Sequence, residues 1–544
     1  AVNSEMDTNE SQAGSGQNPI SNAERLTPTV LIRGLAASLG QDYFTSITPT
    51  DPYRVGRYED SRGPNSILFG IGSPGGFLNQ SSKVATTLRD SANLRYSFGS
   101  WDRSRVELDA NKVVRRDQLA VSLAAVQQEN GGWRQFDFQD KKRIFGSVTF
   151  RPTRTLKVSA MGETGRDIGA VLRSTVESDE ALAWYDNRQA FGVAAVTFTP
   201  NNTLPTAAQQ ALGVTARDVA RTGNNRRAVF IENDGTVFAN GGTFLTGSYN
   251  NAVVRAPDGT PGMTGSALRI NDPAFFPRTM NAAGPGMYRY QSLKNYTITA
   301  DWQATRDLAF NLAHNYQDTA VTVNLMTGTE PTLRGDPNRT LGVGGVANPY
   351  AGRLYFDGNW RRDVHVGNAR ETRLSASYSL DTKSKWFGRH RLAAMVSQSE
   401  QFDQRANSWL ALAGRPFNAV ANNANNRIAV RNYITEGSYA TYRVGDWRKL
   451  PATVNFLGRD YGLVFANEVA GANNSGGEQE GKSMLGVVQS HFLDGKLVTT
   501  FGYREDRVDV IELGYTTDPI AGDLVDRDRR KAKITSATGR TEAT

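Results

Sequence analysis

The sequence predicts an all-β protein that crosses a membrane as a β-barrel, and three observations support this fold class. None of the 544 residues lie in an apolar run of roughly 18 residues, so a membrane-spanning helix is not expected. Segments of about ten residues alternate between apolar and polar side chains, which indicates strands with two different faces. Short turns and very long polar connections join these segments in alternation, a pattern typical of transmembrane barrels.

The strand segments begin at about residue 92 and recur to the end of the chain. In one of them Tyr296, Ile298 and Trp302 share a face, and Thr297 and Asp301 share the other. A period of two residues places each set on one side of a strand. The same alternation is clear around residues 94–99, 105–111, 144–151, 373–380 and 497–504. We count about eleven such strands.

The connections between these strands are of two kinds. Short turns are expected at 152–155, 306–307 and 493–495, and long loops at about 165–291, 320–368 and 398–482. Compact soluble domains rarely contain structureless loops of that length. The sequence from Asp506 onward is polar, and an odd number of strands does not close a barrel of the usual even kind. We therefore expect this chain to hold only part of a barrel, as a fragment of a longer protein.

Composition argues against several other classes of protein. The chain has no cysteine, which excludes a disulfide framework and cysteine-based metal centres. Its four histidines, His314, His365, His390 and His491, lack metal-ligand spacing, so we expect no metal site and no cofactor. No catalytic triad or pair of carboxylates follows from spacing, so we expect no enzyme. The net charge of +8 comes without an uninterrupted basic block, and we expect no nucleic-acid partner.

The most specific motif lies before the strand segments, at residues 58–79. Arg62-Gly63-Pro64 interrupts a short strand, and a small apolar cluster follows. The glycines after it permit tight backbone turns with positive φ. A nucleotide-binding glycine loop fits poorly, because no helical pattern follows and no Lys-Ser/Thr pair closes the stretch.

This motif resembles the end of the plug domain of TonB-dependent outer-membrane receptors. The matching positions are Glu59, Arg62, Gly63, Pro64, Ser66, Leu68, Gly70, Pro74, Gly75, Gly76 and Asn79. Upstream, residues 30–34 resemble the family's strand that ends in Arg33-Gly34. The resemblance implies polar or early-plug sequence at 1–25, the C-terminal part of a small α+β plug at 26–85, and about 11 of 22 antiparallel barrel strands at 86–544.

The resemblance also implies a function, namely energy-coupled uptake of a scarce ligand such as a ferric siderophore or an oligosaccharide across the bacterial outer membrane. The expected partners are the TonB–ExbB–ExbD complex, the small-molecule ligand, outer-membrane lipid and a surface lipoprotein. Family plugs pair charged residues with the inner barrel wall. By resemblance Arg33, Glu59 and Arg62 are candidates on the plug, and the candidates on the wall are Arg95, Glu107, Asp109 and Asp301.

Ligand contacts are expected from the plug apex and the outer loops. The candidates are Gln41, Tyr43 and Phe44 on the plug, with Trp133 and Phe136 in a hairpin loop, since aromatic rings beside amides can stack on a sugar or a siderophore. Two other readings stay open. A soluble or surface all-β binding or adhesion protein explains the alternation but not the plug motif. A glycan-active β-rich enzyme lacks an evident pair of acids.

Overall fold

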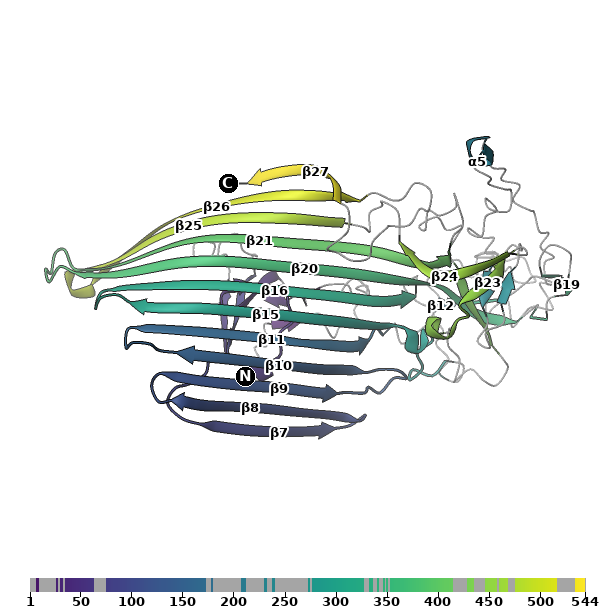
Figure 1. Ribbon diagram of the computed structural model, residues 1–544, viewed down its shortest axis with the longest axis horizontal. Helices are drawn as coiled ribbons and strands as arrows, with labels where there is room; N and C mark the ends of the chain where they lie inside the picture. Colours follow the sequence, from purple (N-terminus) through teal and green to yellow (C-terminus); the bar gives the residue numbers. More distant parts are fainter. Residues whose placement is uncertain are drawn as a thin grey trace, which may run out of the picture.

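The computed structural model describes most of the barrel strands that this chain contains and part of the rest of the chain. The described residues are 6–8, 26–27, 30–32, 35–62, 75–172, 178–179, 207–211, 229–231, 237–239, 273, 276–326, 332–335, 340–341, 346–347, 349–350, 353–413, 428–434, 446–456, 459–467, 475–515 and 534–543. They form a curved barrel wall, a small plug sheet and a set of short strands near one end of the wall (Figure 1).

The wall is a series of long antiparallel strands, each in register with the next. In the part of the chain that the structure describes, twelve long strands pair one after the next, one more than the sequence indicated, because residues 534–543 also pair. Figure 1 shows their order across the wall. The strands are β7 (Ser91–Gly99), β8 (Arg103–Arg115), β9 (Leu119–Glu129), β10 (Gln139–Phe150), β11 (Leu156–Ala170), β15 (Tyr288–Gln303), β16 (Leu308–Met326), β20 (Leu354–Asp381), β21 (Arg389–Leu412), β25 (Ser475–Phe492), β26 (Leu497–Tyr515) and β27 (Ile534–Ala543).

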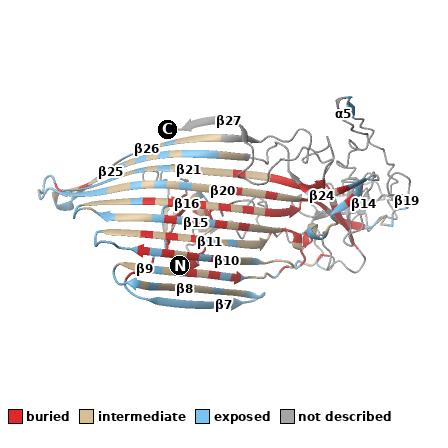
Figure 2. Ribbon diagram, in the orientation of Figure 1, coloured by how far each residue is buried: buried red, intermediate tan, exposed pale blue. Residues whose placement is uncertain are grey.

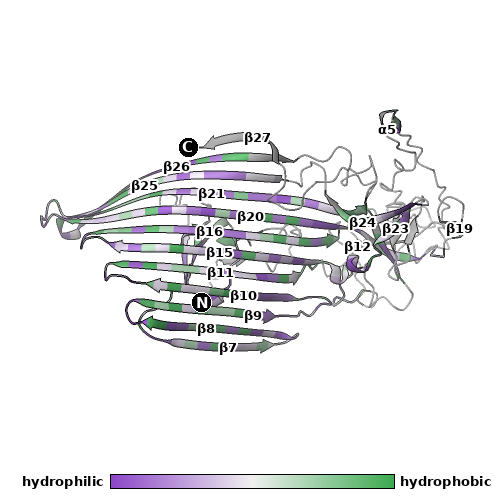
Figure 3. Ribbon diagram, viewed as in Figure 1, coloured by the Kyte–Doolittle hydropathy of each residue, from purple (hydrophilic) through white to green (hydrophobic). Residues whose placement is uncertain are grey.

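The two faces of the wall have opposite chemistry, as the alternation predicted. On β15, Tyr296, Ile298 and Trp302 point outward and stay exposed, whereas Gln291 and Asn295 point inward and are buried. The hydropathy colours change from residue to residue along these strands in Figure 3. Inward polar side chains contact the plug, and outward apolar side chains form the band that lipid would cover.

From β11 onward, the connections at the two ends of the wall differ strongly in length, whereas β7–β8 and β9–β10 are joined by the shorter connections 100–102 and 130–138. At one end, which we call the turn end, the connections are short: 116–118, 151–155, 304–307, 382–388 and 493–496. At the other, the loop end, β11 and β15 are joined by 171–287, β16 and β20 by 327–353, and β21 and β25 by 413–474. These three connections fall within the ranges expected for the long loops, and the strands extend into those ranges.

The strands are longer than the sequence predicted, and loop segments cover their ends at the loop end. Met326 on β16 and Trp360 on β20 are buried although both point outward, and Val323 is buried on the inward side. Loop segments cover both faces there, so the sequence loses its alternation while the backbone stays extended. This corrects the expected loop bounds 320–368 and 398–482, which counted the covered strand ends as loop.

The plug is a small sheet with strand order β1-β2-β3-β6-β5, and β4 pairs with β3. Its purple strands lie behind the wall in Figure 1. Among the described residues before 86, the plug has strands and one 3-10 turn rather than an α-helix. The elements are β1 (Met6–Thr8), β2 (Val30–Ile32), β3 (Leu35–Gln41), β4 (Phe44–Thr45), η1 (Pro52–Arg54), β5 (Val55–Arg62) and β6 (Gly76–Ser82).

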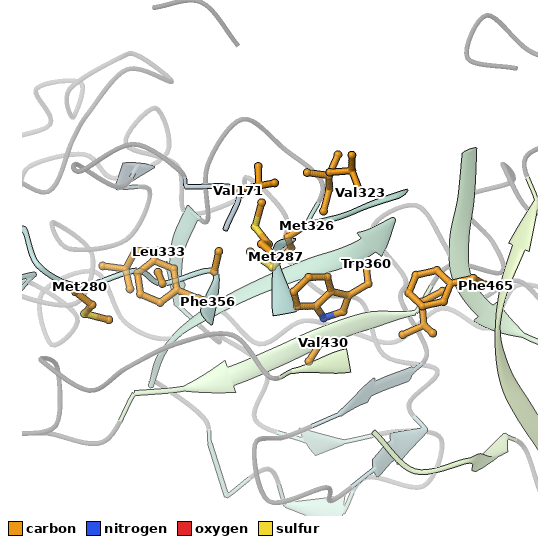
Figure 4. Packing of buried hydrophobic residues seen from close by; sticks show 14 of the residues in the cluster. Val171, Met280, Met287, Val323, Met326, Leu333, Phe356, Trp360, Val430 and Phe465 are labelled. Atoms are coloured by element: carbon orange, nitrogen blue, oxygen red, sulfur yellow. The ribbon is translucent and has the colours of Figure 1, made fainter. Parts of the chain in front are cut away.

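The main apolar core sits at the loop end, where buried residues gather in Figure 2. Trp360 lies at its centre with Met287, Met326 and Phe465 around it (Figure 4). This core joins β16, β20 and β21 to residues 276–287 and to short loop strands. The short strands with residues in this core are β17 (Thr332–Gly335), β22 (Ala429–Tyr433) and β24 (Arg459–Asn467). The other short elements of the described loop segments are β12 (Ser178–Asp179), α5 (Ala207–Ala211), β13 (Val229–Ile231), β14 (Val237–Ala239), η2 (Gly284–Gly286), β18 (Thr340–Leu341), β19 (Val346–Ala347), η4 (Trp447–Lys449) and β23 (Thr453–Phe456).

Among the described residues, no helix has both the length and the apolar character needed to cross a membrane.

Candidate functional site: the plug against the barrel wall

A buried cluster of charges joins the plug to the wall at η1. The Arg54 guanidinium lies 2.7 Å from a carboxylate oxygen of Glu163 on β11, and both side chains are fully buried. The Tyr53 hydroxyl donates to the same carboxylate at 2.9 Å, and Asn295 donates to its other oxygen at 3.2 Å. Arg143 on β10 lies 3.5 Å away. Glu163 therefore serves as the common acceptor between the plug and three strands of the wall.

Local sequence explains why these side chains meet. The Asp51 side chain caps η1 by accepting from the backbone amide of Tyr53, and Pro52 begins the turn. Arg54 also donates to Ser82 on β6 at 2.9 Å, which holds it within the plug. Burial of opposite charges is tolerated when hydrogen bonds satisfy the ions, as they do for Glu163.

Asp51 forms a second ionic contact, nearer the loop end. It accepts from Arg105 on β8 at 2.5 Å and from Lys141 on β10 at 3.2 Å. Burial alone would raise the pKa of this carboxyl. The hydrogen bond from Arg105 and the charge of Lys141 outweigh burial and lower the pKa of Asp51 to about 2. Asp51 is therefore ionised at neutral pH and attached to two wall strands.

A third group of contacts is made by uncharged amides. Gln41 donates to Asn295 at 3.2 Å. Gln317 on β16 accepts from the Ile47 amide at 2.9 Å and donates to the Thr45 carbonyl at 2.8 Å. These bonds fix the backbone of residues 45–48 against the wall, because buried amides that lose their partners cost free energy.

The β3–β4 turn points toward the turn end of the wall. Tyr43 has a positive φ, and its carbonyl accepts from Arg373 on β20 at 3.3 Å. The Arg373 guanidinium also lies over the Phe44 ring, 4.7 Å from its centroid, and pairs with Glu371. Gln41 and Phe44 are buried. The structure thus places the three plug ligand candidates in the plug–wall contact rather than facing the outer loops.

The plug motif forms its own network around Asn79. Asn79 donates to Glu59 at 3.0 Å and accepts from the Tyr43 amide at 2.8 Å. Glu59 also accepts from the Tyr43 hydroxyl at 2.5 Å and pairs with Arg57 at 3.0 Å. In these contacts Glu59 stabilises the plug sheet and the 42–43 turn, whereas the sequence predicted a contact with the wall.

The motif glycines are required by close backbone approach. A side chain at Gly75 would lie 2.4 Å from the Leu35 carbonyl oxygen, and Gly76 has a φ of 116°. Both support the close passage of residues 75–76 beside β3.

Arg33, Gly34, Gly63, Pro64 and Gly70 lie outside the described residues, and Arg62 is described only as the last residue of β5.

The wall residues expected to meet the plug face inward. Asp109 pairs with Lys83 at 2.5 Å, at the end of the plug segment. Glu107 pairs with Arg105 at 2.5 Å, and through Arg105 it supports Asp51. Arg95 lies 3.8 Å from Glu107, and Asp301 lies 3.6 Å from Lys157. The last two are contacts within the wall.

Trp133 and Phe136 lie at the loop end, in the β9–β10 connection. This connection is tied to residues 279–280 by the Gln135 amide at 2.8 Å and the Arg134 guanidinium at 3.0 Å. Trp133 is about half exposed. Phe136 borders a groove with Tyr288 and Tyr290. The structure therefore places both aromatic residues where the loops gather, apart from the three plug candidates.

The residues that join plug and wall most tightly, Asp51, Arg54, Arg143 and Glu163, were not singled out from sequence. Asp51-Pro52 is a recognisable signal for a capped turn. Nothing in the local sequence shows which wall residue such a turn will meet, because Tyr53 and Glu163 are 110 residues apart.

Comparison with known proteins identifies the fold. No family model matches the chain. Over 147 residues it is 31% identical to the metal-pseudopaline receptor CntO of Pseudomonas aeruginosa, which covers 26% of this chain and 20% of the receptor. The crystal structure of BauA, the ferric preacinetobactin receptor from Acinetobacter baumannii, is similar with a TM-score of 0.52 at 11% identity, over 93% of this chain and 54% of that one.

A second solved structure agrees. The ferripyoverdine receptor of the outer membrane of Pseudomonas aeruginosa matches with a TM-score of 0.52 at 11% identity, over 90% of this chain and 47% of that one. The chain spans about half the length of the solved receptors and about a fifth of the curated relatives that it matches. Together with the plug sheet docked on an inward polar wall, these likenesses show that the chain has the plug-and-barrel fold of the TonB-dependent outer-membrane receptors.

Proposed function

We propose that this chain forms the plug end and part of the barrel of a receptor that imports a scarce metal chelate, such as a ferric siderophore, across the bacterial outer membrane. The observation that carries the proposal is the docking of the plug through Arg54 and Asp51 onto inward charges of the wall. A barrel wide enough to pass a chelate must be closed when idle. A plug held by ionic contacts closes it and leaves contacts that can be broken.

The named relatives favour a metal chelate over an oligosaccharide. The curated relative is a receptor for a metal complex, and the solved neighbours are receptors for ferric preacinetobactin and ferripyoverdine. Release of the plug contacts needs work, and the TonB–ExbB–ExbD complex is the proposed source of that work. No catalytic step is proposed.

The proposed ligand contacts lie at the loop end. Trp133 is half exposed beside the ordered loop segment 276–287 and is the proposed aromatic contact. Gln41 and Phe44 are buried against the wall, and Tyr43 lies at the turn end, so these three are proposed to act in closure of the plug.

The test uses the full-length gene in a strain that lacks its own siderophore receptors. Uptake of 55Fe is measured with a panel of catecholate, hydroxamate and carboxylate chelates, with and without an intact tonB gene. We expect energy-dependent uptake of at least one chelate, abolished by loss of TonB. The Trp133→Ala variant should raise the chelate concentration needed for half-maximal uptake. A protein recovered in the soluble fraction would overturn the proposal, as would binding of an oligosaccharide without uptake of any chelate.

A further inference from the structure

A pocket of about 220 Å³ lies at the turn end, where the plug joins the barrel wall. One side of it is formed by residues 84–88, which belong to the linker 83–90 between β6 and β7. Thr149, Arg151 and Lys157 of the wall form the other side. We call this space the junction pocket. Because the short turns of outer-membrane barrels face the periplasm, the junction pocket lies at the periplasmic end of the wall.

The wall side of the junction pocket belongs to the inward face. Arg143 on β10 donates to the Pro49 carbonyl of the plug at 2.8 Å. Thr149 and Arg151 have the same parity along the chain as Arg143, so they face inward as well. Lys157, opposite Arg151, faces the same way. The pocket is therefore separated from the outer surface of the wall, and lipid there does not neutralise its charges.

The two cations of the junction pocket face each other across a pair of strands. The register pairs Phe150 with Val158, so the next residues, Arg151 and Lys157, lie opposite one another. Like charges in that position destabilise a sheet. Lys157 lies 3.6 Å from Asp301, which offsets one of the two charges. Within the described part of the chain, Arg151 forms no ion pair.

The acidic residues beside the linker are already paired. Asp109 pairs with Lys83 and Asp90 pairs with Lys112, each at 2.5 Å. These two carboxylates flank the linker and leave the charge of Arg151 uncompensated.

Asp117 is the other carboxylate close to the junction pocket, since its backbone amide donates to the Thr87 carbonyl at 3.2 Å. Two basic residues, Arg115 and Arg116, precede it in the same turn, and Arg154 lies in the next turn. Basic side chains therefore outnumber acidic ones around the pocket, and the resulting positive potential attracts anions.

Two buried hydroxyls beside these cations have no hydrogen-bond partner among the described residues. Thr149 lines the junction pocket, and Ser159 lies directly opposite Thr149 in the register. Both side chains are buried, and neither hydroxyl is bonded. Most buried polar groups in native proteins do have a partner, and losing one is costly. An oxygen of a bound anion would supply the acceptor that the Thr149 hydroxyl lacks.

We propose that the junction pocket binds a small oxyanion from the periplasm, a phosphate or a carboxylate, between the linker and the inner wall. The Arg151 guanidinium presents a fork of donors that suits both kinds of oxyanion. Lys157 adds a second charge-assisted hydrogen bond, and Thr149 donates from its hydroxyl. The inference rests on the orientation of the barrel in the outer membrane. It goes beyond import and does not depend on which chelate passes through the receptor.

A bound anion would strengthen the attachment of the linker to the wall. The Ala85 amide donates to Ser147, and the Thr86 amide donates to Asn111, each at 2.9 Å. These bonds hold the same segment that lines the junction pocket. The anion would neutralise the opposed cations beside them, so it should stabilise the linker in its docked position.

The test titrates the purified full-length receptor in detergent with inorganic phosphate at constant ionic strength, by isothermal titration calorimetry. The variant R151Q/K157Q should bind roughly 10-fold more weakly or worse, since it loses both charge-assisted contacts. The matched control is R306Q/K496Q, which removes two exposed basic side chains from other turns and should bind as the parent does. Citrate in place of phosphate distinguishes the two sources of oxyanion, and binding of either one supports the proposal.

Hydrogen exchange locates the bound anion. Phosphate should slow exchange at residues 84–88 of the parent and should leave R151Q/K157Q unchanged. Thr149→Val removes only the unbonded hydroxyl. It should weaken phosphate binding roughly 10-fold, yet the receptor without phosphate should be at least as stable as the parent, because a buried hydroxyl without a partner is lost. A purely structural role of Thr149 would lower stability and leave binding unchanged.

Three outcomes would overturn the proposal: a parent that binds neither phosphate nor citrate, equal binding by the parent and R151Q/K157Q, or an equal loss in R306Q/K496Q. Heat-modifiable gel mobility verifies that each variant is folded. Uptake of 55Fe chelates by the parent is measured in parallel and tests the receptor function separately, so failure of one proposal is distinguishable from failure of the other.

Discussion

Arg54 of the plug and Glu163 of the barrel wall lie 2.7 Å apart with both side chains fully buried. They come from segments far apart in sequence and form the centre of the plug–wall contact. A buried ion pair is costly to break, because removal of one partner leaves an uncompensated charge away from water. This pair therefore contributes to how firmly the plug is held against the wall, together with the contacts of Asp51 and Gln317.

Replacement of Glu163 by Gln should loosen the plug. The change removes the negative charge between Arg54 and Arg143, and the expected loss is roughly 3–5 kcal/mol. Hydrogen exchange of residues 47–55 in the full-length receptor measures it, and we expect faster exchange there with little change in β15 or β16. Tyr53→Phe is the control, since it removes one hydrogen bond to Glu163 worth about 1 kcal/mol. Equal protection in the parent and E163Q would contradict this role.

Acid should weaken the Asp51 contact in a defined range of pH. Because the folded-state pKa is lowered from 3.8 to about 2, the stabilisation is present in full above the unfolded pKa and is lost as pH falls through the folded value. The shift corresponds to roughly 2 kcal/mol at neutral pH. Urea titrations of a receptor with a dye on a single cysteine at position 50 report the plug, since the chain has no cysteine of its own.

In Asp51→Asn the urea midpoint of the plug should be lower at pH 7 and should no longer fall between pH about 4 and about 2. Gln317→Ala, which removes two plug–wall hydrogen bonds that involve no ionisable group, should keep the acid dependence of the parent. An Asp51→Asn receptor with an unchanged acid dependence would show that another carboxylate is responsible.

Arg373→Ala should make the closed receptor leaky. Arg373 contacts the Tyr43 carbonyl and the Phe44 ring, the contacts that fix the β3–β4 turn to β20. A partly buried cation–π contact contributes about 1–2 kcal/mol. The measurement is the sensitivity of cells to a large antibiotic that normally fails to cross the outer membrane, which should rise. Arg370→Gln on the outward face is the control, and equal sensitivity of both variants and the parent would contradict the closure role.

The sequence was sufficient to predict the fold class and the alternating faces of the strands, because period-two alternation is a local property. It underestimated strand length where loops cover both faces, as at Trp360 and Val323, since alternation disappears there. The plug motif was recognised from its spacing, and Gly75, Gly76 and Asn79 do form close backbone contacts and a hydrogen-bond network. The pairing of Arg54 with Glu163 could not be predicted, because it depends on how the plug is seated in the wall.

Gly75→Ala should destabilise the plug without altering the wall. The new methyl group would lie 2.4 Å from the Leu35 carbonyl oxygen and 2.7 Å from that of Ala36, so the backbone beside β3 must shift. Overpacking of this kind costs about 1–3 kcal/mol. Gly486→Ala is a matched control, because a methyl group there meets no atom within 4 Å. We expect limited proteolysis to cleave the plug faster in Gly75→Ala alone, while both variants keep the heat-modifiable mobility of a folded barrel. Cleavage at the rate of the parent would show that residues 75–76 can move away from β3 at little cost, and the tight plug motif would then need another explanation.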